Sequence, residues 1–279
     1  MREFKVKDLS VKIEQMLLEA CENIPNNILD ALREAAKVEE SKLGKEVLEK
    51  IIANDELART CHLPICQDTG IVVCFLEIGY DVHFDGDIYE AINEGVKNAY
   101  TNGYLRKSVV RHPLDRVNTK DNTPAITHIK LVPGDKVKIT VAPKGGGSEN
   151  MSLVKMLIPA DGIEGVKKLV LDTVFNASGK PCPPIIVGIG IGGDLEKAAI
   201  LAKEALMREI DDKNDDFILN KMEIDLLDEI NKLGIGPMGF GGKVTCLGVK
   251  INAYPCHIAS LPVAINIQCH ASRHKSCIM

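Results

Sequence analysis

Three of the nine cysteines stand where a strand-like run ends or a loop turns, so that the backbone around each thiol is open to a ligand. Cys66 begins the run Cys-Gln-Asp-Thr-Gly, Cys182 lies among prolines, and Cys269 follows an apolar run. Thiolates bind iron–sulfur clusters and zinc, but residues so far apart in the chain share a site only if the fold assembles it. Spacing alone does not distinguish such a site from three unrelated cysteines, since Cys is also a common small core residue.

Three other side chains have the chemistry of a catalytic or substrate-binding group. Asp68 follows Cys66 closely and is either the residue that forms a turn or an acid–base group. Arg106 is most simply a surface charge, although its planar guanidinium would also suit a substrate carboxylate. His257, between two strand-like runs, is either a hydrogen-bonded structural residue or a catalyst.

Two glycine clusters lead into helix-like segments. Gly145, Gly146 and Gly147 precede Ser148, a good helix N-cap, and their successive N–H groups form either an anion site or a plain tight turn. The second cluster, Gly188–Gly193, satisfies the G-x-G-x-x-G pattern of dinucleotide-binding proteins. No acidic residue ends a strand about 20 residues later, as that fingerprint requires, so close packing of a helix on a strand explains these glycines better. A nucleotide-binding module that uses Gly188–Gly193 is the distant alternative for the function.

Composition narrows the class of protein. The chain has 279 residues, 45% of them hydrophobic and 26% charged, which is ordinary for a globular protein with a sizeable core. A net charge of −5 and the absence of Trp argue against nucleic acid as a partner. No apolar run reaches the ~18 residues of a membrane span, and no signal peptide is evident, so we expect a cytoplasmic protein that does not bind membranes.

The apolar periodicity predicts an α/β fold with mixed sheets and flanking helices, in one domain over residues 1–279. Residues 1–60 are expected to form a mostly helical layer and residues 61–279 a mixed α/β part that carries the candidate ligands. Further helices are expected at 87–100, 162–175, 195–210 and 217–233, and strands at 71–78, 137–141, 185–190, 244–251 and 263–267. The charged run 211–216 is expected to be a solvated linker, and residues 102–124 a long loop of the kind that is more often functional than idle. Periodicity does not determine the order of the strands.

Several of these segments, in this order, resemble the iron–sulfur-dependent (class I) fumarases and the related L-tartrate dehydratases. The matching segments are Cys66-Gln-Asp-Thr-Gly70, Asp121-Asn-Thr-Pro-Ala125, Lys144-Gly-Gly-Gly-Ser148, Cys182-Pro-Pro184 with Gly188–Gly193, Tyr254-Pro-Cys-His257 with Ala259-Ser-Leu-Pro262, and Cys269-His-Ala-Ser-Arg-His274. The ordered set spans most of the chain and is much more specific than any one of its members. The chain resembles the α subunit of the two-subunit form of these enzymes.

The resemblance implies a hydro-lyase that reversibly hydrates fumarate to L-malate, a step of the tricarboxylic acid cycle, with dehydration of L-tartrate as the alternative. It implies a [4Fe–4S] cluster held by three cysteines, which map to Cys66, Cys182 and Cys269. Cys277 competes with Cys269 for the third place, and we prefer Cys269 because the family motif surrounds it. Such a cluster has one iron without a protein ligand, which acts as a Lewis acid.

The resemblance also assigns roles to the remaining candidates. It places Asp68 in the acid–base set and His257 in the hydrogen-bond network of that set. It assigns the carboxylates of a small dicarboxylate substrate to Gln67, Arg106 and the backbone around Gly146 and Gly147. A separate β subunit is expected to complete the active site, in an α2β2 heterotetramer.

Overall fold

A computed structural model describes residues 2–279, and these divide into two compact units. The first unit comprises residues 2–24, 55–146 and 273–279, and the second comprises residues 25–54 and 147–272. Neither unit is continuous in the sequence. The single domain predicted over residues 1–279 thus contains two compact parts.

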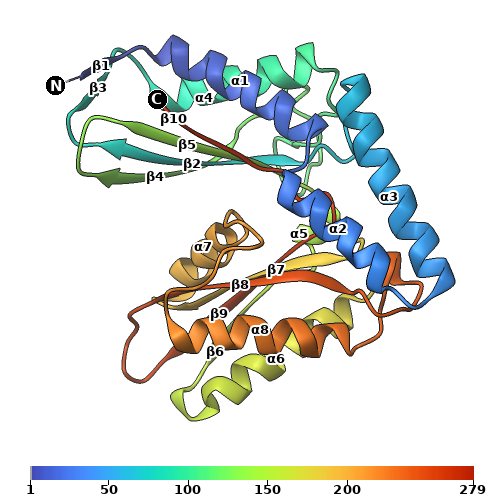
Figure 1. Ribbon diagram of the computed structural model, residues 1–279. Helices are drawn as coiled ribbons and strands as arrows, with labels where there is room; N and C mark the ends of the chain where they lie inside the picture. Colours follow the sequence, from blue (N-terminus) through green and yellow to red (C-terminus); the bar gives the residue numbers. More distant parts are fainter. Residues whose placement is uncertain (1) are drawn as a thin grey trace. The chain divides into compact units, whose positions relative to one another are not determined.

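The first unit is built on a mixed four-stranded sheet of order β10-β5-β2-β4, in which only β2 and β4 run parallel. The parallel pair β1-β3 lies apart from this sheet. Helices α1 and α4 pack on one face of the sheet (Figure 1). The elements are β1 (Arg2–Phe4), α1 (Val6–Glu22), β2 (Ile71–Gly79), β3 (Val82–Phe84), α4 (Ile88–Asn102), β4 (Ile126–Val132), β5 (Val137–Lys144) and β10 (Lys275–Ile278).

Alternation along β2 explains why the two helices cover one face. Val72, Cys74, Leu76 and Ile78 point to the same side of the strand and are buried in the core that α1 and α4 complete. The helices approach each other closely at Gly95 of α4, where an added Cβ would lie 2.6 Å from the carbonyl oxygen of Ser10. The segment from 103 to 125 has no long strand or helix, as the sequence predicts.

The second unit is built on a second mixed sheet, of order β6-β9-β7-β8, in which only β7 and β8 run parallel. Helix α7 covers one face of this sheet, and α6 and α8 cover the other (Figure 1). Helix α3 begins in this unit and ends in the first. The elements are α2 (Asn26–Val38), α3 (Lys42–Cys61), α5 (Gly146–Glu149), β6 (Leu153–Leu157), α6 (Gly162–Ala177), β7 (Ile185–Gly192), α7 (Leu195–Ala205), α8 (Phe217–Asn231), β8 (Cys246–Tyr254), β9 (Leu261–Gln268) and single 3-10 turns at Pro159–Asp161 and Pro237–Gly239.

The glycine pattern 188–193 lies mostly inside β7 and serves packing. A Cβ on Gly188 would lie 2.2 Å from the carbonyl oxygen of Ala202, and one on Gly190 would lie 2.0 Å from that of Ala198. Both oxygens belong to α7, which therefore rests directly on the backbone of the strand. The space above these glycines is filled by protein, which favours packing over the alternative of a dinucleotide site.

Gly190→Ala is therefore expected to destabilise the protein by about 3 kcal/mol, the upper end of the usual cost of overpacking a core. The reason is that the added methyl group meets backbone, which cannot rotate away. The change is measured as the shift of the urea midpoint at constant slope. Gly147→Ala is the control, since a Cβ there meets nothing closer than 3.8 Å. Equal stability of the two variants would contradict the packing role.

Glu39 joins the connection after α2 to a distant loop. Its buried carboxylate accepts backbone N–H groups from Glu40 and Ser41 at 2.8 Å, from Lys243 at 2.9 Å and from Val244 at 2.8 Å. Burial alone would raise the pKa of this carboxyl, but the four N–H donors outweigh it and hold the pKa below its usual value. Glu39 thus stays ionised and links the two segments through these four hydrogen bonds.

Glu39→Gln is expected to cost about 2 kcal/mol of unfolding free energy at pH 7, as for other hydrogen bonds to a charged group. Because the folded-state pKa is depressed, the contribution is present above the unfolded pKa and is lost as the pH falls through the folded value. Wild type and variant should therefore converge in stability in acid. The check is urea unfolding from pH 7 downward, with the exposed neighbour Glu40→Gln as control. If the difference in unfolding free energy between wild type and Glu39→Gln persisted unchanged in acid, the ionised carboxylate would not be the source of the stabilisation.

The α/β class is confirmed, and the N-terminal region is helical as predicted. Helix α1 belongs to the first unit and α2 to the second. Among the helices of residues 2–279, none combines the length and apolar character that crossing a membrane requires.

Candidate functional site

The loop between α3 and β2 carries three of the predicted site residues of the first unit. The thiol of Cys66 is half-buried, and its Sγ accepts the N–H of Asp68 at 3.4 Å. The neighbouring Gln67 is exposed, and its Oε1 accepts the Cys66 S–H at 3.5 Å. Hydrogen bonds to sulfur are among the groups that tune iron–sulfur clusters, so this thiol has suitable surroundings for a cluster ligand.

The carboxylate of Asp68 links this loop to the first glycine cluster. Its Oδ1 accepts the N–H of Gly70 at 3.1 Å, which makes an Asx turn, and its Oδ2 accepts the N–H of Gly146 at 2.8 Å. A Cβ on Gly145 would lie 3.2 Å from Oδ2. The fold thus brings the predicted acid–base residue and the predicted anion-binding loop together. The N–H of Gly146 in that loop already binds an anion, the carboxylate of Asp68 itself.

Gly70 ends the loop at a position that requires glycine. Its φ is +76°, and an added Cβ would lie 2.6 Å from the backbone of Lys144. The same contact brings the start of β2 against the end of β5, just before Gly145 and Gly146. Strand pairing therefore sets the distance between Asp68 and the glycine loop.

Arg106 lies beside the same loop. Its carbonyl oxygen accepts the hydroxyl of Thr69 at 2.8 Å, while its side chain is exposed. The role that the resemblance assigns to its guanidinium stays a prediction.

In the second unit, the fold places Cys182 and Cys269 on neighbouring backbone segments. The N–H of His270 donates to the carbonyl oxygen of Cys182 at 3.4 Å. Cys182 itself has a φ of +58°, in the left-handed region that is uncommon for a residue with a side chain, and its N–H donates to Gly179 at 3.2 Å. Such strained positions cluster at functional sites. Gly147 lies near the same turn, since an added Cβ would be 3.8 Å from the oxygen of Lys180.

His257 lies in the exposed connection between β8 and β9. Its Nδ1 accepts the N–H of Ala259 at 3.1 Å, and its carbonyl accepts Ser260. These hydrogen bonds are local and leave Nε2 to solvent or to a ligand, so the role that the resemblance assigns to His257 stays a prediction.

Among the other cysteines, three are buried in the cores and Cys277 is half-buried beside one of them. Burial raises the pKa of the Cys21 thiol to about 11 and those of Cys74 and Cys246 to about 12, which keeps all three protonated and inert. Cys277, the competitor of Cys269, lies in β10 and packs against the first core, where its Sγ contacts the Sδ of Met16 at 3.3 Å. A thiol turned into a hydrophobic core is a poor ligand, and this favours Cys269.

Across residues 2–279, no three His, Cys, Asp or Glu side chains are gathered closely enough to hold a single metal ion. Cys66 belongs to one unit, and Cys182 and Cys269 belong to the other. The donor chemistry nevertheless fits an iron–sulfur cluster, since all three thiols are half-buried and follow or precede buried backbone.

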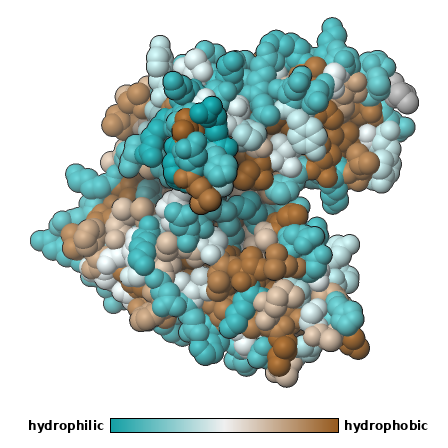
Figure 2. Space-filling model, turned by 180° about the vertical axis from the view of Figure 1, so that it is seen from behind, coloured by the Kyte–Doolittle hydropathy of each residue, from teal (hydrophilic) through white to brown (hydrophobic). Residues whose placement is uncertain are grey.

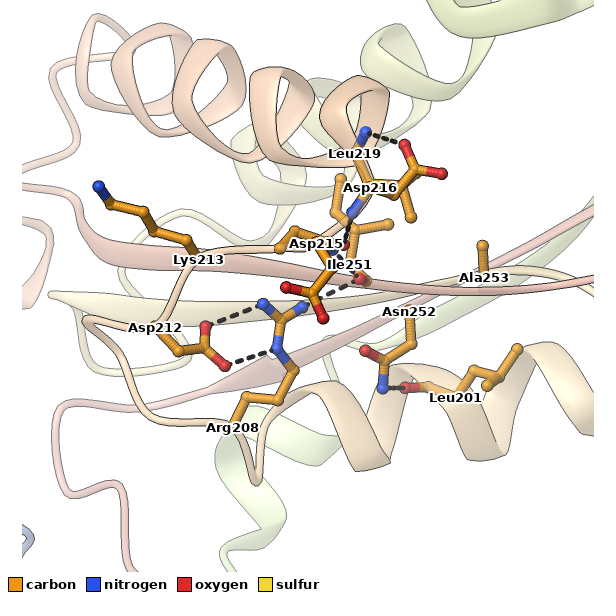
Figure 3. A pocket seen from close by; sticks show the side chains of 11 residues that line it. Leu201, Arg208, Asp212, Lys213, Asp215, Asp216, Leu219, Ile251, Asn252 and Ala253 are labelled. Carbon is orange, nitrogen blue, oxygen red and sulfur yellow. Dashed lines mark hydrogen bonds and ion pairs between the residues drawn. The ribbon is translucent and has the colours of Figure 1, made fainter.

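A pocket of about 560 Å³ in the second unit contains none of the predicted site residues (Figure 3). The charged side chains that line it are paired with other groups of the protein. Arg208 donates to both oxygens of Asp212 at 2.8 and 2.9 Å and also to Glu223 at 2.8 Å. Arg208 and Asn214 both donate to the carbonyl of Ile251, at 3.0 and 2.8 Å, on the edge strand β8.

The charged run 211–216 is therefore more than the solvated linker that the sequence predicts. Burial would raise the pKa of the Asp212 carboxyl, but its hydrogen bonds to Arg208 and Lys250 lower it. Asp212 and Asn214 thus serve to cover the edge of β8. The pocket is best explained as a consequence of this covering.

Comparison with known proteins agrees with the cysteine and glycine segments. A family model described as fumarate hydratase (Fumerase) matches residues 10–278. The chain belongs to the fumarate hydratase family. It is accordingly an enzyme of the hydro-lyase class, as the sequence predicts.

Two relatives within the fumarate hydratase family illustrate how far the similarity extends. A protein of Methanocaldococcus jannaschii named putative L(+)-tartrate dehydratase subunit alpha is 46% identical over 276 residues, which are 96% of this chain and 95% of the relative. The L(+)-tartrate dehydratase subunit alpha of Escherichia coli (strain UTI89) is 32% identical over 254 residues, which are 90% and 84% of the two chains. The resemblance predicted from the motifs is thus confirmed at the level of the family.

Proposed function

We propose that the chain is the α subunit of a hydro-lyase that interconverts fumarate and L-malate. The observation that carries this proposal is the hydrogen-bonded arrangement of Asp68 between Cys66 and Gly146. The backbone N–H of Asp68 contacts the candidate cluster thiol, and its carboxylate lies on the glycine loop that is the candidate anion site. Hydration of a double bond between two carboxylates can use these three elements: a metal centre, an acid–base group and carboxylate recognition.

Cys66, Cys182 and Cys269 would hold a [4Fe–4S] cluster. When bound, such a cluster supplies one iron without a protein ligand, which polarises the hydroxyl group of the substrate. The chemistry of the three half-buried thiols supports this assignment, and the core position of Cys277 supports Cys269 as the third ligand.

Asp68 would exchange the proton in the reaction. Its two oxygens are fixed by Gly70 and Gly146, so the carboxylate is held in one orientation before substrate arrives. The substrate carboxylates would bind to the exposed side chains of Gln67 and Arg106 and to the N–H of Gly147. Gly146 would contribute by holding the carboxylate of Asp68. His257 would join the hydrogen-bond network around the acid–base group.

A separate β subunit would complete the active site in an α2β2 assembly in the cytoplasm. The names of both relatives as alpha subunits support such a partner. Exposed hydrophobic side chains on the edge strand β6, just after it and at the start of α6 are also typical of a protein with a partner. They are Leu153, Val154, Met156, Ile158 and Ile163. The space-filling view from behind shows hydrophobic side chains at the surface among the polar ones (Figure 2).

L(+)-tartrate dehydration is the second candidate, because the relatives are named for it. Tartrate differs from malate by one hydroxyl group, so the chemistry asked of Asp68 and of the cluster is the same. The distinction then depends on contacts to the second hydroxyl.

The deciding experiment is anaerobic co-expression of the chain with a β-subunit homologue, followed by assay on fumarate, L-malate and both tartrate enantiomers. The proposal predicts the highest kcat/KM for fumarate and L-malate, and little turnover by this chain alone. A preference for L(+)-tartrate would establish the second candidate. Absence of activity on all four compounds with a loaded cluster would overturn both.

A further inference from the structure

The last three carbonyl groups of the Cys66–Gly70 loop, those of Asp68, Thr69 and Gly70, are each held by a buried side chain from elsewhere in the first unit. Tyr100 donates from Oη to the oxygen of Thr69 at 2.5 Å and to that of Gly70 at 3.2 Å. Asn122 donates from Nδ2 to the oxygen of Gly70 at 3.2 Å. Both side chains are fully buried. These neutral groups satisfy two of the three carbonyls that follow Gln67.

The third carbonyl, that of Asp68, is held by a cation. Arg273 donates from Nη2 to this oxygen at 2.7 Å and is only 2% exposed. Its Nε and Nη1 have no hydrogen-bond partner within residues 2–279. A backbone carbonyl needs no charged donor, and burying an arginine side chain carries a large desolvation free energy.

Two buried groups close to Arg273 do not compensate for its charge. Cys21 and Tyr100 lie within electrostatic range, but burial raises the pKa of the Cys21 thiol to about 11 and raises the pKa of the Tyr100 hydroxyl as well, so both are neutral. The carboxylate of Asp68, whose carbonyl Arg273 holds, lies on the same loop. A Cβ on Gly145 would lie 3.8 Å from Arg273 Nη2 and 3.2 Å from Asp68 Oδ2, so the guanidinium and this carboxylate flank one glycine without forming an ion pair.

We propose that Arg273 is a positioning residue that holds the Cys66–Gly70 loop ready for the cluster, and that the negative charge of the assembled centre compensates for its buried cation. This inference rests on the proposed function. It assigns a role to a residue four positions after Cys269 in the chain, where the sequence passes from the second unit into the first.

The melting temperature of the cluster-free chain distinguishes a buried charge that serves function from one that serves stability. If Arg273 served stability alone, Arg273→Met would lower the melting temperature. If its charge is compensated only in the assembled centre, the variant without cluster is as stable as wild type or more so, as when other buried ions are replaced by apolar side chains. The loop itself would nevertheless loosen, because the Asp68 carbonyl loses its donor.

The experiment compares wild type, Arg273→Met, Arg273→Gln and Arg273→Lys in three measurements. These are the melting temperature of the cluster-free chain, hydrogen exchange of the amides of Asp68 and Gly70, and iron retained after anaerobic reconstitution. For Arg273→Met we expect an unchanged or higher melting temperature, exchange faster by about tenfold or more, and iron retention reduced by about tenfold or more. Arg273→Lys should recover part of the iron, whereas Arg273→Gln, a donor without charge, should not.

Arg59→Met is the matched control, because Arg59 also donates to a backbone carbonyl in the first unit, that of Ile24 at 3.1 Å. It should leave loop exchange and iron retention unchanged. Unchanged loop exchange in Arg273→Met, or wild-type iron retention in Arg273→Gln, would overturn the proposal. If wild type itself takes up no iron, the proposed function fails, while the exchange measurement still decides whether Arg273 holds the loop.

Discussion

Cys182→Ser is expected to leave a folded chain that retains almost no iron, with hydro-lyase activity reduced by more than about 100-fold. Removing one of three thiolates lowers cluster affinity by more than the loss of a supporting contact does, and the serine hydroxyl is a poor ligand for iron. The position tolerates Ser sterically, because the thiol is only half-buried. Iron and acid-labile sulfide analysis after anaerobic reconstitution gives the result directly.

Cys277→Ser is the matched control for this substitution. Cys277 is also half-buried, but its thiol packs against Met16 in the first core. We expect full cluster loading in this variant and at most a small loss of stability. Loss of the cluster in Cys277→Ser together with its retention in Cys269→Ser would reverse the choice of the third ligand.

Asp68→Asn is expected to lower kcat by about 10²–10⁴-fold, the usual contribution of a general acid–base group. An amide cannot exchange the proton, although its oxygen can still accept the N–H of Gly70 or Gly146. Cluster content should therefore remain near that of wild type. The measurement is steady-state kinetics with the β subunit present, normalised to iron content.

Asp85→Asn provides the comparison, since Asp85 also accepts a backbone N–H in the first unit, that of Val6 at 2.8 Å. It should not change kcat. If Asp68→Asn retained more than about a tenth of the wild-type kcat at equal iron content, Asp68 would be a structural turn residue and not an acid–base group.

The long periodic elements of this fold are predictable from the sequence, while several short strands are not. Helices α1, α3 and α6 each repeat buried residues over three turns or more, so their periodicity is evident. β4 and β6 lie at sheet edges and expose residues on both faces, which removes the alternation that identifies a strand. The pairing of β10 with β5 joins residues more than 100 positions apart, which no local pattern indicates.

The candidate site shows the same limit. The types of Cys66 and Asp68 and the glycines after Lys144 are visible in the sequence, and pairing of β2 with β5 is what brings them together. The role of Arg273 was not predicted, although it stands in the segment that resembles the fumarases. The segment around it is polar in sequence, so only the structure shows that this arginine is buried and that two of its nitrogens lack a hydrogen-bond partner.

The most direct test of the account is Mössbauer spectroscopy of the anaerobically purified chain reconstituted with iron-57 and sulfide. The account predicts about four irons per chain in a [4Fe–4S] cluster. One iron should be distinguishable from the other three and should change its signal when L-malate is added to the complex with the β subunit. A folded chain that takes up no cluster, or one whose four irons are equivalent and indifferent to substrate, would contradict it.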